Sequence, residues 1–285
     1  MTTESISLDE LSAVVIPLLE QARQIALAPE ELEIQTKSDR NDLVTQVDKR
    51  IEQFLAKELT EITGYPMLGE EGHTLDSFAG RVWVLDPIDG TMNYVATHRD
   101  YAISLALVED GIPALGIVVD VTKGLFYVAQ KGKGAYCNNK KIDVVPDKLP
   151  YQDAVLITDI KEICAIPRLK QALVDSRGHR RYGSAALELV EVACGRAGAF
   201  VHLWVSPWDI AAATLICEEA GCTVTRLDGT NMDVRQKGSI LVGWPNVHSS
   251  LLKRLVQDPG LIPKICVFCR ACRGGLVSCP AFADV

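Results

Sequence analysis

The sequence lacks several features that would place it in specialised classes of protein. It has no run of 18 apolar residues, so we expect no membrane-spanning helix. Positive charge is in deficit, because 29 Lys and Arg face 37 Asp and Glu and give a net charge of -8. This balance argues against nucleic-acid or anionic-membrane binding, which needs clustered basic residues. The opening MTTESISLDE has neither the basic nor the apolar region of a secretory signal, so we expect a cytoplasmic protein.

What the sequence does contain is the composition of an ordinary globular protein. Hydrophobic residues make up 48% and charged residues 23% of the 285 positions, which is enough to build a sizeable core. Internal repeats and low-complexity linkers are missing. We therefore expect one domain over residues 1–258, made of two coupled halves at about 1–145 and 146–258, followed by a separate segment at 259–285.

The nine cysteines divide into two groups. We expect five of them to be buried, reduced thiols, namely Cys137, Cys164, Cys194, Cys217 and Cys222. The other four crowd the final segment with the spacing Cys266-x2-Cys269-x2-Cys272-x6-Cys279. That spacing could hold an iron–sulfur cluster or zinc, which would make the protein a redox or metal protein at this end. A poorly ordered appended tail is the simpler interpretation, and we favour it.

Hydrophobic periodicity predicts helices and strands in alternation. Ser7 to about Ala28 reads as an amphipathic helix that begins with a Ser7–Glu10 capping box and contains Pro17. Helices are also expected over 42–62, 184–194, 207–220 and 247–256. Strands are expected over 81–85 (ended by Pro87), 125–129, 154–158, 199–203, 222–226 and 239–243, and as a hairpin over 102–108 and 113–119. This order predicts a layered α/β or α+β architecture.

The most informative stretch for chemistry runs from Leu68 to Tyr94. Glu70 lies in a Gly-Glu-Glu-Gly turn, and Asp86 and Asp89 follow a buried strand in the run Asp-Pro-Ile-Asp-Gly-Thr. A carboxylate at the end of a buried strand is costly unless something pairs with it. Hard cations such as Mg²⁺ prefer carboxylate and carbonyl oxygens. These acids, with the Ile88 carbonyl between two of them, therefore predict a metal site rather than ordinary turns.

Two helix starts in the second half are candidates for the same site. Asp209 follows Ser206 and Pro207, a pattern that by itself predicts a helix cap. A capping Asp can still direct its other oxygen into a site. The Gly183-Ser184-Ala185 run opens another helix, whose free N–H groups could bind a substrate oxygen, although plain capping by Ser184 is the simpler interpretation.

Taken together, these motifs resemble the inositol monophosphatase family. The resemblance covers about residues 8 to 257 and rests on Gly69-Glu70-Glu71, on Asp86–Thr91 and on Trp208–Ala212. A segment from Asp42 to Asp48, with Lys37 upstream, is also similar. The family implies an α-β-α-β-α layered sandwich of the inositol monophosphatase/fructose-1,6-bisphosphatase type, usually a homodimer. It also implies lithium-sensitive hydrolysis of a small phosphate monoester with two or three Mg²⁺ ions, for which Mn²⁺ could substitute.

The resemblance also assigns roles by position. The metal ligands would be Glu70, Asp86, the Ile88 carbonyl, Asp89 and Asp209, and the catalytic residues Asp48, Glu70 and Thr91, with Asp48 and Thr91 activating the attacking water. Substrate contacts would come from Ile88, Asp89, Gly90, Thr91, Gly183, Ser184, Ala185, His202 and Asp209. The chain itself shows no compelling Ser, Cys or His nucleophile, which agrees with metal-assisted attack by water.

His202 departs from the family pattern, because animal inositol monophosphatases carry Glu at that position. Inositol monophosphate is the substrate we expect. The departure keeps NADP(H), 3′-phosphoadenosine 5′-phosphate and sugar phosphates open as alternatives. A further alternative is a binding protein that keeps the fold without catalysis, as some bacterial relatives act in transcription complexes.

Overall fold

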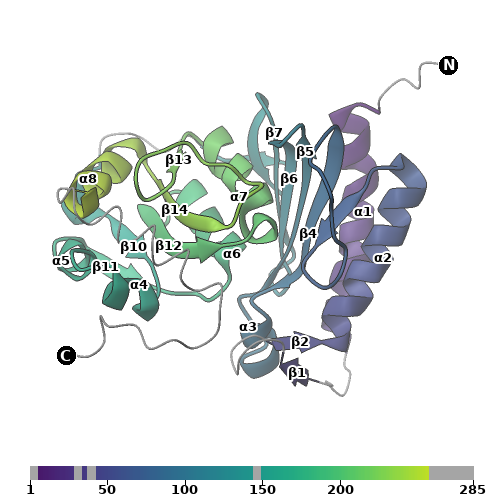
Figure 1. Ribbon diagram of the computed structural model, residues 1–285, viewed down its shortest axis with the longest axis horizontal. Coiled ribbons are helices and arrows are strands. Elements are labelled where there is room, and N and C mark those ends of the chain that lie inside the picture. The colour runs from purple at the N-terminus through teal and green to yellow at the C-terminus, as the bar shows by residue number, and fades with distance from the viewer. Residues whose placement is uncertain (1–5, 29–33, 37–42, 144–148, 257–285) are drawn as a thin grey trace.

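The computed structural model describes residues 6–28, 34–36, 43–143 and 149–256 (Figure 1). The elements of the first half are α1 Leu8–Leu27, β1 Ile34–Thr36, β2 Leu43–Thr45, α2 Gln46–Thr63, β3 Met67–Gly69, β4 Arg81–Asp89, α3 Thr91–Ala96, β5 Ala102–Glu109, β6 Ile112–Asp120, β7 Leu125–Gln130, β8 Gly134–Cys137 and β9 Lys140–Lys141. Those of the second half are a 3-10 turn at Tyr151–Asp153, β10 Val155–Ile157, α4 Ile160–Ala165, α5 Leu169–Val174, β11 Gly178–Arg180, α6 Ala185–Ala193, β12 Ala199–Val205, α7 Pro207–Glu219, β13 Thr223–Thr225, β14 Gly238–Gly243 and α8 Pro245–Val256.

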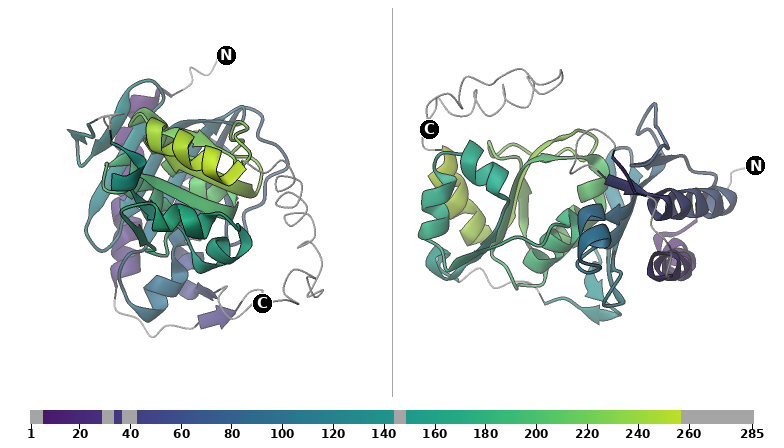
Figure 2. Two further views of the ribbon diagram at one scale, coloured as in Figure 1. Left: turned by 90° about the vertical axis from the view of Figure 1, so that its left-hand side faces the viewer. Right: turned by 90° about the horizontal axis from the view of Figure 1, so that it is seen from below.

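These elements stack as five layers. Helices α1 and α2 cover the outer face of a seven-stranded sheet, and α6 and α7 lie between that sheet and a second, five-stranded sheet (Figure 1). Helices α4, α5 and α8 pack on the far side of the second sheet, as the two further views also show (Figure 2). The α-β-α-β-α sandwich that the family resemblance implied is therefore confirmed.

The two sheets differ in strand order and strand direction. The larger sheet has the order β3-β4-β5-β6-β7-β8-β9 and is antiparallel apart from the parallel β3–β4 pair. The smaller sheet has the order β11-β10-β12-β14-β13, with β10 parallel to both of its neighbours. In the part of the chain that the structure describes, no helix is long and apolar enough to cross a membrane.

Strand β4 shows how the larger sheet divides the core. Trp83 and Leu85 belong to the apolar cluster beneath α1 and α2, whereas Val82 and Val84 belong to the cluster shared with α6 and α7. This alternation follows from the two-residue period of a strand, and it explains the nearly continuous apolar run, since both faces are covered. Asp86 continues the Val82–Val84 series toward the middle layer.

Two boundaries expected from the sequence are wrong. The second helix does not begin at residue 42 but at Gln46, because Thr45 caps it and β2 pairs with β1 just before. Strand β4 is not stopped by Pro87 but runs to Asp89. Its pairing with β5 is irregular between Asp86 and Asp89, so the missing N–H of Pro87 falls where no regular ladder bond is made.

Of the other predictions from the sequence, some are confirmed and some are wrong. The Ser7–Glu10 capping box is confirmed, as is the hairpin, whose Asp110-Gly111 turn has positive φ at both residues. Several short elements were not anticipated: β3, β8, β9, β11, α4 and α5. Cys217 and Cys222 are buried as expected, but Cys164 is exposed. The four cysteines of the tail, with all of 259–285, lie outside the described residues.

Gly116 of β6 generates a prediction about the middle layer. A Cβ at this glycine would lie 2.5 Å from the backbone oxygen of Ala212 in α7. We expect Gly116→Ala to lower the free energy of unfolding by about 1–3 kcal/mol, the usual cost of overpacking, as measured by urea denaturation. Gly178→Ala is the control, because its Cβ would meet only Arg180 Nη1 at 3.8 Å. Equal stability of the two variants would contradict the tight β6–α7 contact.

Candidate active site

The end of β4 carries two buried carboxylates. Asp86 is 2% exposed and Asp89 is 7% exposed, and they lie on either side of the irregularity in the pairing with β5. Asp86 Oδ1 accepts the Ile88 N–H at 3.0 Å. Gly90 then turns the chain with φ +94°, a conformation that favours glycine, and α3 follows. The strand thus ends as a rigid turn that holds both acids inside the molecule.

Helix α2 contributes a third buried acid at its first turn. Asp48 completes a capping box with Thr45, accepting its N–H at 3.0 Å and also its hydroxyl. Thr91 Oγ1 lies 3.1 Å from Asp48 Oδ1 and 3.1 Å from the Ile88 carbonyl oxygen, so its single proton can serve either acceptor. Burial raises the pKa of Asp48, although the Thr45 bonds oppose the rise. The Asp48–Thr91 pair expected from the resemblance therefore does come together.

Asp89 joins the two halves of the molecule. Its carboxylate accepts the Ser184 hydroxyl at 2.5 Å, the Ala185 N–H at 3.2 Å and the Ala186 N–H at 2.7 Å, all at the start of α6. Burial nevertheless raises the pKa of Asp89 to about 6, because desolvation exceeds the effect of these bonds. Ser184 and Ala185, which the sequence placed against substrate, thus contact Asp89 in this structure.

Asp209 reaches the site from the first turn of α7. One of its oxygens accepts the Ser206 N–H at 2.7 Å in a capping box. Its pKa is raised well above the usual value by burial, with further contributions from Asp89 and Glu70, while Lys237 opposes the rise. Capping and membership of the acidic cluster, which the sequence allowed together, both describe this residue.

The acids form one electrostatic cluster, which we call the acidic cluster: Asp48, Glu70, Asp86, Asp89 and Asp209. The pKa of Asp86 is raised well above its usual value, first by burial and then by the other four carboxylates in turn. Glu70 is only partly buried, and its N–H donates to the Leu85 carbonyl at 3.2 Å, which ties its loop to β4. Like charges held this close disfavour one another's ionised form.

The chemistry of this donor set suits a hard divalent cation. It offers carboxylate oxygens and the Ile88 carbonyl but no sulfur or nitrogen donor, the combination that Mg²⁺ prefers. Among residues 6–28, 34–36, 43–143 and 149–256, no three acidic, His or Cys side chains already converge as a finished metal cage. Asp86 and Asp89 are instead bonded to backbone N–H groups. The carboxylates therefore interact electrostatically, but their side chains do not all point at one common position.

A pocket of about 180 Å³ opens beside the acidic cluster. Of the residues expected to bind substrate, Asp89, Gly183, Ala185, His202 and Asp209 line it. Sequence reasoning missed the other five, which are Asp159, Arg181, Glu188, Trp204 and Val205. Because they come from four separate segments of the second half, only the fold brings them together, and no local motif marks them.

Two polar pairs shape the far wall of this pocket. Arg181 Nε lies 2.9 Å from Asp159 Oδ2; burial raises the pKa of Asp159, but the Arg181 guanidinium outweighs burial and the net shift is downward. His202 Nδ1 accepts the Trp204 N–H at 3.1 Å and lies 3.6 Å from buried Glu162. Burial lowers the pKa of His202, which favours the neutral imidazole. The wall therefore mixes donors and acceptors suited to a polar organic group.

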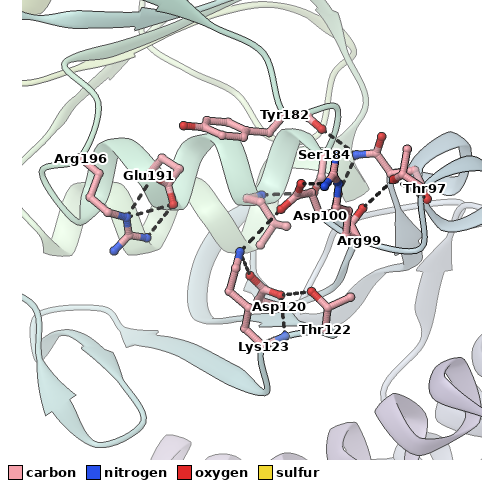
Figure 3. A network of polar contacts seen from close by, with 12 residues as sticks. Thr97, Arg99, Asp100, Asp120, Thr122, Lys123, Tyr182, Ser184, Glu191 and Arg196 are labelled. Atoms are coloured by element: carbon pink, nitrogen blue, oxygen red, sulfur yellow. Dashed lines mark hydrogen bonds and ion pairs between the residues drawn. The ribbon is translucent and has the colours of Figure 1, made fainter.

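A second set of contacts locks the halves together next to the pocket. Asn93 Nδ2 donates to the Asp100 carbonyl at 2.7 Å and to the Tyr182 carbonyl at 2.6 Å. Figure 3 shows Asp100 beside Lys123, whose Nζ lies 3.6 Å from Asp100 and 2.8 Å from Asp120. The loop that precedes β5 is thus held both to the larger sheet and to the start of α6.

Crowding of negative charge leads to a stability prediction. A carboxyl whose pKa is raised on folding opposes folding above its unfolded pKa. We therefore expect Asp86→Asn to raise the Tm of the metal-free protein at neutral pH by a few degrees, given that about 1 kcal/mol moves the Tm of a chain this size by about 2–4 °C. Asn can still accept the Ile88 N–H.

We expect Mg²⁺ to stabilise the wild type and the same variant to lose much of that effect, because the resemblance assigns Asp86 as a metal ligand and the substitution also removes a charge. Thermal scans with and without Mg²⁺ measure both effects. Asp76→Asn, at an exposed position, is the matched control. A lower Tm for metal-free Asp86→Asn than for the wild type would refute the charge argument.

Comparison with known proteins places this geometry in a family. The model of the inositol monophosphatase family matches residues 4–259. An inositol-1-monophosphatase of Bacillus subtilis is 38% identical over 236 residues, covering 80% of this chain and 89% of the relative. The Nus factor SuhB of Vibrio cholerae is 34% identical over 233 residues, covering 78% and 86%.

A solved structure agrees with this assignment. An IMPase/NADP phosphatase complexed with Mg²⁺ and phosphate superposes with a TM-score of 0.81 at 30% identity, covering 88% of this chain and 96% of that one. The chain therefore belongs to the inositol monophosphatase family and is a phosphatase.

Proposed function

We propose that the protein hydrolyses a small phosphate monoester, most directly inositol monophosphate, with Mg²⁺. The observation that carries the proposal is an acidic cluster in which Asp48, Asp86 and Asp89 are buried, Asp48 accepts the Thr91 hydroxyl, and Asp89 and Asp209 line a polar pocket. Crowded carboxylates contribute little to the stability of the folded protein by themselves. They do suit divalent cations, which in turn attract a phosphate group.

Glu70, Asp86, Asp89, Asp209 and the Ile88 carbonyl would hold two or three Mg²⁺ ions, for which Mn²⁺ could substitute. When bound, such ions lower the pKa of a coordinated water and neutralise charge on the phosphate. Because Asp86 and Asp89 are anchored by backbone N–H bonds through one or both oxygens, their remaining lone pairs face a fixed direction.

The chain's own residues would direct the attacking water. Thr91 Oγ1 donates to Asp48 or to the Ile88 carbonyl, so its lone pairs are free to accept a hydrogen bond from water. Asp48, whose pKa is raised by burial, would receive the proton through that hydroxyl. The backbone N–H groups of Gly90 and Thr91 would contact the phosphate. Ile88, Asp89, Gly183, Ser184, Ala185, His202 and Asp209 would surround the rest of the substrate.

The pocket supports alternatives within the same reaction. Trp204 is 41% exposed and lines the pocket together with Arg181 and Asp159, so an aromatic or sugar group of a larger substrate has surfaces to contact. The similarity to an IMPase/NADP phosphatase favours NADP(H) as the second candidate. 3′-Phosphoadenosine 5′-phosphate and sugar phosphates complete the set. If the protein hydrolyses no phosphate monoester, its similarity to the Nus factor SuhB leaves a binding role without catalysis as the remaining candidate. From the family resemblance we also infer a homodimer and inhibition by Li⁺.

Removing the proposed base tests the mechanism. We expect Asp48→Asn to lower kcat for inositol monophosphate by about 10²–10⁴-fold, the usual contribution of general base catalysis, with KM changed little. Phosphate release measures the rate, and circular dichroism checks that the capped helix still forms. Exposed Asp76→Asn serves as control. Activity of Asp48→Asn equal to that of the wild type would exclude the proposed role.

Substrate choice is tested at His202, which lines the pocket away from Asp48 and Thr91. We expect His202→Asn to raise KM for the preferred substrate about tenfold with kcat nearly unchanged, since it removes a contact to the substrate's organic part. His98→Asn is the matched control, because His98 is exposed and has a positive φ that Asn tolerates.

The two histidine variants are assayed on inositol monophosphate, NADP, 3′-phosphoadenosine 5′-phosphate and fructose 1,6-bisphosphate with Mg²⁺. The substrate with the highest wild-type kcat/KM identifies the branch of the family. A wild-type protein that hydrolyses none of the four compounds would overturn the proposed function and leave the binding role.

A further inference from the structure

Glu52 of α2 is a buried acid that the acidic cluster does not include. It lies one helical turn after Asp48, on the same face of the helix, and its side chain is 3% exposed. Its partners come from the loop after β3. Oε2 accepts the Glu71 N–H at 2.7 Å, Oε1 accepts the His73 N–H at 3.1 Å, and His73 Nδ1 lies 2.7 Å from Oε1. Glu52 thus occupies the inside of a turn.

This turn is the one that carries Glu70. The Gly69 N–H donates to the His73 carbonyl at 2.8 Å and closes the loop, while the Glu70 N–H donates to the Leu85 carbonyl at 3.2 Å. Glu70 is therefore fixed to β4 through its own N–H, and the residue after it is fixed to α2 through Glu52. With the backbone held on both sides, the direction of the Glu70 side chain depends on these anchors.

Gly69 allows Glu52 to come this close. A Cβ at position 69 would lie 2.8 Å from Glu52 Oε1 and nearer still to the other carboxyl atoms. The φ of Gly69 is not in the left-handed region, so space rather than backbone conformation explains the glycine. In the Gly-Glu-Glu run, Glu70 belongs to the acidic cluster, and Gly69 leaves the space that Glu52 occupies behind the loop.

We propose that Glu52 is a positioning residue for Glu70, acting as a carboxylate clamp behind the loop of residues 69–73. The proposal rests on the proposed function for the identity of the cation, Mg²⁺. One face of α2 then serves both parts of the site: Asp48 contacts Thr91, and Glu52 fixes the loop that presents Glu70.

The clamp needs a carboxylate because two N–H groups must be accepted at once. A Gln at position 52 has one acceptor oxygen, and its NH₂ group would face a backbone N–H, donor against donor. Outer partners that orient metal ligands typically contribute 10–100-fold to metal affinity or activity. We therefore expect Glu52→Gln to weaken Mg²⁺ binding by about 10–100-fold, measured by titration calorimetry without substrate.

A second variant separates position from charge. Gly69→Ala keeps the Glu52 carboxylate but forces it away from the loop, so it should also weaken Mg²⁺ binding. Glu61→Gln, on an exposed side of the same helix, removes equal charge and should not. In both test variants the Mg²⁺ concentration for half-maximal phosphatase activity should rise, and kcat should recover at saturating Mg²⁺, because Asp48 and Thr91 are intact.

The outcomes are distinct. Wild-type Mg²⁺ affinity in folded Glu52→Gln or folded Gly69→Ala overturns the proposal, and weakening only in Glu52→Gln assigns the effect to charge. If both variants are unfolded, Glu52 has a general structural role and the proposal fails. Weaker Mg²⁺ binding in both, in a protein that hydrolyses no phosphomonoester, would uphold the clamp while refuting the proposed function.

Discussion

Burial of several negative charges where β4 ends and α2, α6 and α7 begin is the constraint on which this structure depends. Carboxylates of the acidic cluster raise one another's pKa, and transferring them from water is costly. The fold reduces this cost with three helix N-termini, since α2, α6 and α7 all begin at the site. Asp48, Asp89 and Asp209 each accept N–H groups there. The positive ends of the helices thus face the acids, a favourable arrangement for negative charge, while unused lone pairs remain for a cation.

These residues both cap helices and take part in the acidic cluster, which explains why the sequence supported two interpretations at the same positions. The Ser-Pro-x-Asp pattern at Asp209 predicts a helix cap, and the structure has the cap; yet Asp209 is also coupled electrostatically to Asp89 and Glu70. Ser184 likewise caps α6 through the Leu187 N–H and donates to Asp89. Local patterns identified the caps because their partners lie within three residues. Membership of the cluster depends on contacts between distant segments, and only the resemblance to a family supplied those.

Other features had no local pattern at all. The sequence located the long helices, the central hairpin and the Asp-Pro-Ile-Asp-Gly-Thr turn, because periodicity and turn residues mark them. It missed β3 and β11, which have three residues each and depend on neighbours for their hydrogen bonds. Pro87 appeared to end its strand, but β4 continues past it because the pairing with β5 is irregular there. The far wall of the pocket was also missed, since Asp159 and Arg181 are ordinary charged residues until the sheet places them together.

The two halves of the chain contribute different parts of the candidate active site. The first half supplies Asp48 from α2, Glu70 after β3, Asp86 from β4 and Thr91 from α3, whereas the second half supplies most of the pocket wall. Asp89 belongs to the first half but is bonded to α6 of the second, so the packing of α6 against β4 fixes where the acidic cluster lies relative to the rest of the pocket wall. In the function we propose, the wall contacts the organic part of the substrate, so substitutions there, such as the His at position 202, would change which organic group fits. They would leave Asp48 untouched, because its cap lies in the first half, at Thr45. A family built this way can diversify its substrates while its phosphate chemistry stays the same.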